Sequence, residues 1–144
     1  MKHALTVISL LLLAGSAGAQ HNPGYVEYGN IRFRDEKAML DHYASQLRLD
    51  PDTVVYIFAY SGRAACTDEA KVRAVRARNY LVKKQGIMPE RVIWREGGLR
   101  EYLSVELWLR SRAAPAPEPA PTVDPADATL KDCRRRKRAG VVGS

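Results

Sequence analysis

The sequence predicts an α+β fold, a two-layer βαβαββ sandwich whose two helices pack on one face of a mixed sheet. Residues 53–60 form an almost continuous apolar run, which is typical of a central strand. The segments before and after this run carry apolar residues at helical spacing. Residues 104–110 alternate between two faces, one of them apolar, which indicates a half-buried strand. The connections are long enough for right-handed crossovers, so helices and sheet should form separate layers.

The first strand is predicted over residues 25–33, which are rich in β-branched and aromatic side chains. We expect the next helix to have Asp35 as its N-cap, because a carboxylate accepts hydrogen bonds from the free N–H groups of a first helical turn. The apolar face of this helix comprises Met39, Leu40, Tyr43, Ala44 and Leu47. Pro51 follows the helix and stops it.

The second helix is predicted to begin after Thr67, which can serve as its cap. One stripe of this helix consists of small or apolar residues, namely Ala70, Ala74, Ala77 and Leu81. Three alanines in that stripe would let the helix lie close to the sheet. Gly86 is expected just beyond the helix end, where a left-handed backbone favours glycine. Residues 91–95 then form a third strand, which Gly97 and Gly98 end.

Composition divides the chain into five segments. Residues 1–19 combine a basic start, an apolar run and an Ala-x-Ala cleavage motif, so we interpret them as a signal peptide and expect a periplasmic or secreted protein with no transmembrane segment after cleavage. Alternating Ala and Pro predict an extended linker, and a basic, disordered tail should follow it. The predicted segments are the signal peptide (1–19), a short N-terminal segment (20–24), one folded domain (25–112), the linker (113–128) and the tail (129–144).

The formal net charge is +7, and a block of five basic residues lies at 134–138. Export makes nucleic acid an unexpected partner. Two interpretations of this block remain open. It could contact an anionic surface, or it could be part of a solvated tail, which is the default interpretation.

Two cysteines are present, Cys66 in the predicted domain and Cys133 in the predicted tail. An exported protein can form disulfides. Because we expect the tail to be mobile, we predict two free thiols, or an intermolecular bond through Cys133, rather than an internal disulfide.

His21 and His42 are isolated, so no metal site or cofactor is predicted. There is no nucleophile–base pair and no paired acid/base carboxylate motif, so the protein is not expected to be an enzyme.

Residues 25–112 resemble the OmpA-like C-terminal domain of bacterial envelope proteins. The resemblance rests on a strand that ends at Ala59-Tyr60-Ser61-Gly62, on three pairs behind it (Arg73-Ala74, Tyr80-Leu81 and Gly86-Ile87), and on the final strand segment Val105-Glu106-Leu107. The chain is also similar to small secreted OmpA-like proteins of uncharacterised role. The resemblance implies a βαβαβ core with helices on one sheet, and non-covalent binding of peptidoglycan.

In peptidoglycan-binding members of that family, an Asp at the strand end and an Arg on the helix hold diaminopimelate of the stem peptide. Arg73 matches the Arg, whereas Gly62 stands at the Asp position. We therefore take Arg73 as a candidate ligand-binding residue, with a solvated helix residue as the equal alternative. Arg63 is a second candidate anion contact, although an ordinary loop charge is the favoured interpretation. Asp68 could replace the missing carboxylate, but a favourable first-turn charge is its simpler role.

The resemblance thus implies a non-catalytic envelope protein that associates with peptidoglycan through a degenerate diaminopimelate site. The alternative is an envelope protein–protein interaction module that has kept the fold and lost peptidoglycan binding.

Overall fold

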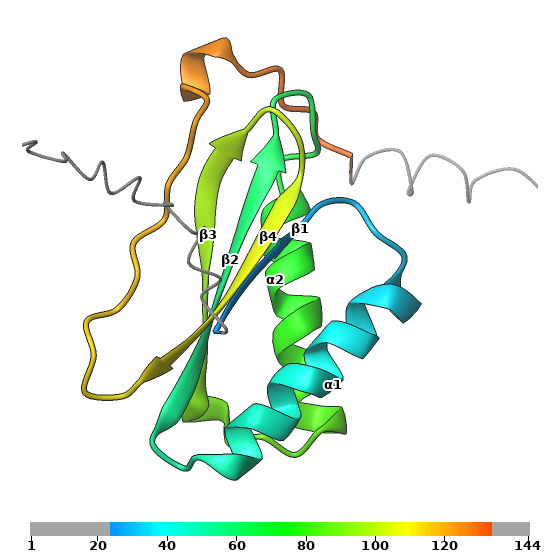
Figure 1. Cartoon of the computed structure of the whole chain (residues 1–144). Helices are drawn as coiled ribbons and strands as arrows, with labels where there is room; N and C mark the ends of the chain where they lie inside the picture. Colours follow the sequence, from blue (N-terminus) through cyan, green and yellow to red (C-terminus); the bar gives the residue numbers. More distant parts are fainter. Residues whose placement is uncertain (1–23, 134–144) are drawn as a thin grey trace, which may run out of the picture.

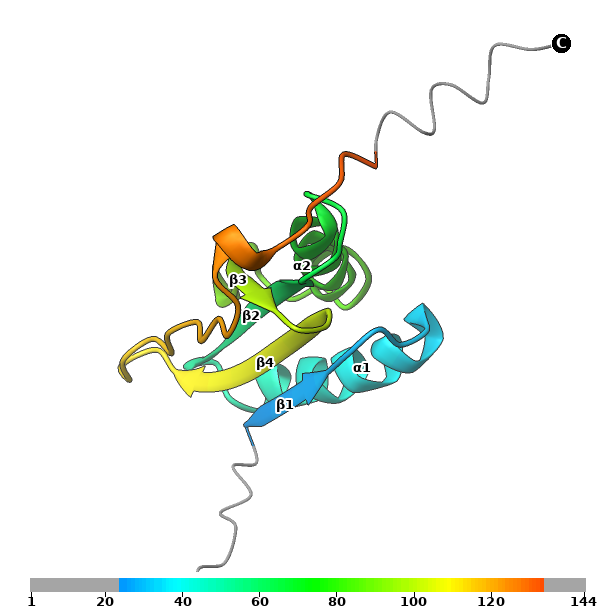
Figure 2. The same cartoon turned by 90° about the horizontal axis from the view of Figure 1, so that it is seen from above.

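The computed structural model describes residues 24–133, which form one mixed four-stranded sheet and two α-helices on the same face of it (Figure 1, Figure 2). The predicted α+β class and the mixed sheet are confirmed, and the arrangement fits a two-layer sandwich. The elements are β1 (Tyr25–Tyr28), α1 (Phe33–Leu49), β2 (Thr53–Gly62), α2 (Glu69–Asn79), β3 (Val92–Arg100) and β4 (Ser104–Ser111). The predicted signal peptide and the basic block at 134–138 lie outside the described residues.

The sheet has the strand order β1-β4-β2-β3. Strands β2 and β3 are parallel and are joined through α2, whereas β4 runs antiparallel to both β2 and β1. Opposite Ile57 in the centre of β2 lie Trp94 of β3 and Leu107 of β4. The most apolar strand therefore lies in the interior of the sheet, as its sequence indicates.

The hydrophobic core fills the space between the sheet and the helices. Alternate residues of β2 and β4 face the helices, and α2 presents its alanine stripe to them. Because alanine has a short side chain, α2 can lie close to β2 and β3. The main buried members are Leu40, Tyr43, Ala44, Leu47, Val55, Ile57, Ala59, Ala70, Ala74, Ala77, Leu81, Val105 and Leu107.

The first strand is shorter than predicted, and Phe33 begins α1 instead of ending β1. The reason is a turn after Tyr28, in which the N–H of Ile31 donates to the carbonyl oxygen of Gly29 at 3.0 Å. Arg32 occupies the N-cap position and makes no capping hydrogen bond through its side chain. The prediction of Asp35 as the cap was wrong, since Asp35 lies within the first turn and pairs with Arg32 at 3.2 Å.

The start of α2 also differs from the prediction. Its N-cap is Asp68, not Thr67, and the Asp68 side chain makes no capping hydrogen bond. Instead, the N–H of Ala70 donates to Oγ of Ser61 at 3.1 Å. A hydroxyl at the end of β2 thus satisfies one of the free N–H groups of the first turn, so the strand end and the helix start are held together. At the far end, Gly86 has the left-handed φ of 69° expected beyond a helix.

Strand β3 does not stop at Gly97 and Gly98, as predicted, but continues to Arg100. The register shifts between Ala59 and Tyr60, so that Glu96 pairs with Ala59 and Gly98 with Tyr60. Gly97 is therefore an extra residue in a β-bulge, and glycine is typical of such positions. Because the β-bulge takes up the extra residue, β3 stays paired with β2 beyond Gly97 and Gly98.

The segment after β4 returns along the domain toward the start of α2 (Figure 1). The N–H groups of Thr122 and Val123 donate to the carbonyl oxygen of Leu99, and Val123 is buried. Residues 129–131 then run beside the loop between β2 and α2, where the N–H of Thr129 donates to the Arg63 carbonyl oxygen at 2.8 Å. Residues 129–133, which we predicted to belong to a free tail, are therefore held against the domain.

Cys66 and Cys133 form a disulfide, with their Cα atoms 5.5 Å apart. The prediction of free thiols or an intermolecular bond was wrong. Its error was to treat the tail as detached from the domain. Two backbone hydrogen bonds bring the cysteines together, because Lys131 donates to the Ala65 carbonyl oxygen at 2.9 Å and accepts from the N–H of Thr67 at 3.0 Å.

Candidate functional site

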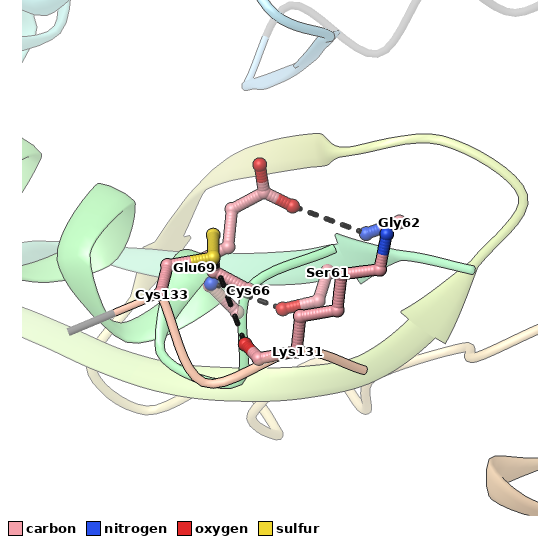
Figure 3. Close-up of a disulfide and its surroundings, with 7 residues drawn as sticks. Ser61, Gly62, Cys66, Glu69, Lys131 and Cys133 are labelled. Atoms are coloured by element: carbon pink, nitrogen blue, oxygen red, sulfur yellow. Dashed lines mark hydrogen bonds between the residues drawn. A yellow bond between two sulfur atoms is a disulfide. The ribbon is translucent and has the colours of Figure 1, made fainter. Parts of the chain in front are cut away.

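Four segments meet at the carboxyl end of β2: the loop after β1, the turn between β3 and β4, the loop from β2 to α2, and the first turns of α2. We call this region the β2-end site and define it by Asn30, Gly62, Glu69, Arg73 and Tyr102. Figure 3 shows part of it, with Gly62 and Glu69 beside the Cys66–Cys133 disulfide. The disulfide fixes the loop at one side of the site.

Arg73 projects from the second turn of α2 toward the loop after β1. Its Nη2 donates a hydrogen bond to Oδ1 of Asn30, a neutral acceptor. Within residues 24–133 no carboxylate forms an ion pair with Arg73, and the side chain is only partly buried. A guanidinium has five N–H donors in a planar fork. Arg73 is thus oriented by Asn30 and keeps donors for a ligand carboxylate.

Gly62 is buried at the end of β2, and its N–H donates to Oε2 of Glu69 at 3.4 Å. The Glu69 side chain therefore brings a carboxylate to the strand position where the resemblance leads us to expect an Asp. A Cβ on Gly62 would lie 3.2 Å from the backbone nitrogen of Leu103, so an added side chain here requires a small shift. Glu69 of α2 thus places a carboxylate beside residue 62.

Glu69 and Arg73 are four residues apart on α2, so they share one helix face. No ion pair joins them in the described part of the chain. The site therefore presents a carboxylate and a guanidinium one helical turn apart, each held by a different neighbouring loop or strand. This arrangement matches a ligand that carries both an ammonium and a carboxylate group.

Arg63, the second candidate from the sequence, does not present a free charge. Its Nε donates to Oε2 of Glu101 at 2.9 Å, and its backbone N–H donates to the Glu101 carbonyl oxygen. The side chains of both residues are about half exposed. Arg63 thus joins the β2–α2 loop to the β3–β4 turn.

Tyr102 lies in the β3–β4 turn and is 80% exposed. Its Cα is 3.6 Å from where a Cβ of Gly62 would lie, so its backbone adjoins the strand end. An exposed aromatic ring in this turn offers a face against which a sugar or peptide can stack. Tyr102 could not be predicted as a site residue, because a single tyrosine in a turn has no distinctive pattern.

Glu69 was also missed as a site residue. From the sequence we considered only Asp68 as the replacement carboxylate. The spacing of Glu69 and Arg73 could have identified the pair. Asp68 is the N-cap residue of α2 and so precedes its first turn, in which Glu69 is the acidic residue.

The two tryptophans are packed on the sheet. The Trp108 ring lies 4.2 Å from that of Tyr25, and its Nε1 donates to Glu106 at 3.1 Å. Trp94 packs against the hydrophobic core on the helix side.

Among residues 24–133 no three His, Cys, Asp or Glu side chains gather in a way that could hold a metal ion. None of the helices in this range has the length and apolar character needed to cross a membrane. No family model matches the chain, and no curated protein matches it. The interpretation of the β2-end site therefore depends on its own geometry and on the resemblance described above.

Proposed function

We propose that this protein is an exported, non-catalytic envelope protein whose OmpA-like domain binds peptidoglycan at the β2-end site. In this proposal Arg73 binds the carboxylate of an amino acid in the stem peptide, and Glu69 binds the ammonium group of the same residue. Diaminopimelate carries both groups on its free end. The observation that carries the proposal is the Glu69 carboxylate at the Gly62 N–H, one helical turn from Arg73.

Export is supported by two independent features. One is the leader-like composition of residues 1–19. The other is the Cys66–Cys133 disulfide, because such bonds persist in oxidising compartments and are rare in a reducing cytosol.

The test is co-sedimentation of the mature protein with purified cell-wall sacculi. Wild type should bind, and both Arg73→Ala and Glu69→Gln should weaken binding by about tenfold or more, since each removes a charge-assisted hydrogen bond. Arg78→Ala is the matched control, because Arg78 lies on the same helix and has no role in the proposed site. Equal losses in Arg78→Ala and Arg73→Ala would mean that only net charge matters, and would overturn the proposal.

A second pair of variants tests whether Glu69 takes the role of the Asp expected at position 62. Gly62→Asp alone should not raise affinity for free diaminopimelate, because the new carboxylate would face Glu69. Gly62→Asp combined with Glu69→Gln should retain binding. If Gly62→Asp alone strengthens binding, Glu69 is not the missing carboxylate. If wild type does not bind sacculi at all, the alternative of an interaction module without peptidoglycan binding is supported instead.

A further inference from the structure

A groove of about 880 Å³ lies between α1 and the far end of α2, and none of the residues that define the β2-end site lines it. Its apolar walls are formed by Phe33, Val72, Val75 and Tyr80. We call it the α1–α2 groove. Its size falls within the range of small-molecule sites, about 300–1,000 Å³. The side chains of Phe33 and Val72 are 38% and 54% exposed, so apolar surface is open to a ligand.

The aromatic wall of the groove is fixed by several contacts. The rings of Phe33 and Tyr80 meet edge to face, with centroids 6.0 Å apart. The hydroxyl of Tyr80 donates to Asp41 at 2.6 Å, and the guanidinium of Arg76 lies over the Phe33 ring, 4.8 Å from its centroid. These contacts join α1 to α2 and hold the wall in place before any ligand binds.

The lining of the groove includes part of an unusual backbone feature. Residues Tyr80–Lys84 form a π-helical turn, which ends with the N–H of Gln85 donating to the Tyr80 carbonyl oxygen at 3.0 Å. π-Helical turns are rare and occur frequently at functional sites. Here the turn brings Tyr80 and two exposed lysines, Lys83 and Lys84, to the same groove.

The charges around the groove are mainly positive. Lys37, Lys83 and Lys84 line it, and none of them forms an ion pair within the described range. Two nearby carboxylates are already engaged. Glu36 is fully buried and pairs with Arg76, and Asp41 accepts from Tyr80 and Gln85. The Lys37 ammonium lies over the Phe33 ring, 5.4 Å from its centroid, which leaves Lys83 and Lys84 as the exposed cations of the groove. Apolar walls and these two ammonium groups are complementary to a molecule with an apolar body and an anionic end.

We propose that the α1–α2 groove binds a free long-chain carboxylate, with its alkyl chain against Phe33, Val75 and Tyr80 and its carboxylate at Lys83 and Lys84. The apolar walls select the chain, and the lysines select the sign of the head group. This proposal is independent of peptidoglycan binding at the β2-end site.

The test is isothermal titration calorimetry of the mature protein with dodecanoate, at concentrations below the critical micelle concentration of dodecanoate. Dodecanoate should bind with one-to-one stoichiometry. Dodecyl maltoside and dodecyltrimethylammonium have an alkyl chain of nearly the same length and a neutral or a cationic head. Both should bind at least about tenfold more weakly than dodecanoate, since they lose the lysine contacts. Octanoate should also bind at least about tenfold more weakly, because it buries four fewer methylene groups.

The double variant Lys83→Glu/Lys84→Glu should lower dodecanoate affinity by about tenfold or more while leaving the circular dichroism spectrum unchanged, because both side chains are exposed. Lys71→Glu is the matched control, since Lys71 is an exposed α2 lysine outside the groove. The proposal is overturned if the three head groups bind equally, if the double variant binds as wild type does, or if binding occurs only to vesicles of anionic phospholipid and not to monomeric dodecanoate.

Discussion

The aromatic ring of Tyr60 occupies the space in which a side chain at Gly97 would lie. A Cβ added to Gly97 would be 2.3 Å from Cε1 of Tyr60, well inside van der Waals contact. The two residues face each other across the β-bulge between β2 and β3. The bulge and the glycine thus make room for a large, fully buried side chain on the face of the sheet away from the core cluster.

Gly97→Ala should therefore lower the free energy of unfolding by about 1–3 kcal/mol, because the buried Tyr60 ring must shift to admit the methyl group. Gly29→Ala is the control, since its Cβ would make an ordinary 3.4 Å contact with the Leu103 carbonyl oxygen. Urea unfolding followed by circular dichroism measures both. Equal stability of the two variants would contradict the steric account.

Glu106 is nearly buried and accepts hydrogen bonds from three side chains of the same sheet face. The donors are the Tyr60 hydroxyl at 2.9 Å, Trp108 Nε1 at 3.1 Å and Arg100 Nη2 at 2.5 Å. Glu106→Ala should destabilise the protein by about 3–5 kcal/mol, because it leaves the largely buried Arg100 without this partner. In thermal unfolding, the double variant Arg100→Ala/Glu106→Ala should lose less stability than the two single variants lose when their losses are added. Additive losses would contradict this coupling.

The disulfide should contribute directly to stability. Cys133→Ser, or reduction of wild type with dithiothreitol, should lower the free energy of unfolding by about 2–5 kcal/mol, since the unfolded chain loses a constraint across 67 residues. Denaturant titrations with and without reductant measure the effect. The variant serves as the internal control, because its stability should not change when reductant is added.

Buried tyrosines should make the protein unstable in alkali. Burial raises the pKa of Tyr43 to about 12 from 10.0, and the pKa of Tyr28 and of Tyr60 is also raised, first by burial. Neighbouring carboxylates contribute, Glu36 for Tyr28 and Glu106 for Tyr60. A raised pKa of an acid means that the folded state disfavours its anion. The associated stability is present below pH 10 and is lost as the pH rises toward the folded-state values.

Phenolate absorbance at 295 nm, recorded together with circular dichroism, tests this expectation. The buried phenols should ionise only as the fold is lost, above pH 10. Tyr43→Phe should remove one of these late-ionising groups, because the Tyr43 hydroxyl is buried and donates to the Leu107 carbonyl oxygen. Ionisation of every tyrosine near pH 10 in an intact fold would contradict the prediction.

Periodicity in the sequence predicted the parts of the fold whose side chains repeat with a regular spacing. The apolar run of β2, the alternation of β4 and the alanine stripe of α2 all lie where they were expected, because burial on one or two faces imposes these patterns directly. The extension of β3 beyond Gly97 could not be predicted in this way. It depends on the Tyr60 ring, which belongs to a different strand.

The site was predictable only in part, for a related reason. Arg73 could be found from its position in a motif, but Asn30, which orients it, is 43 residues away. Glu69 could be seen in the sequence, yet only the fold shows its carboxylate at Gly62. The pairing of Cys66 with Cys133 depends on backbone hydrogen bonds made by a segment whose composition suggested no order.

The position of Cys133 also sets the order of events during biosynthesis. All residues of the sheet and of the two α-helices precede Cys133, so they must be synthesised before the Cys66–Cys133 bond can close. The sheet and helices can form earlier, since all their residues precede Cys133. A newly made molecule would therefore pass through a folded stage without the disulfide, in which the loop before α2 is held by hydrogen bonds and by the Arg63–Glu101 ion pair. Maturation of the β2-end site then depends on an oxidant that the chain itself does not supply.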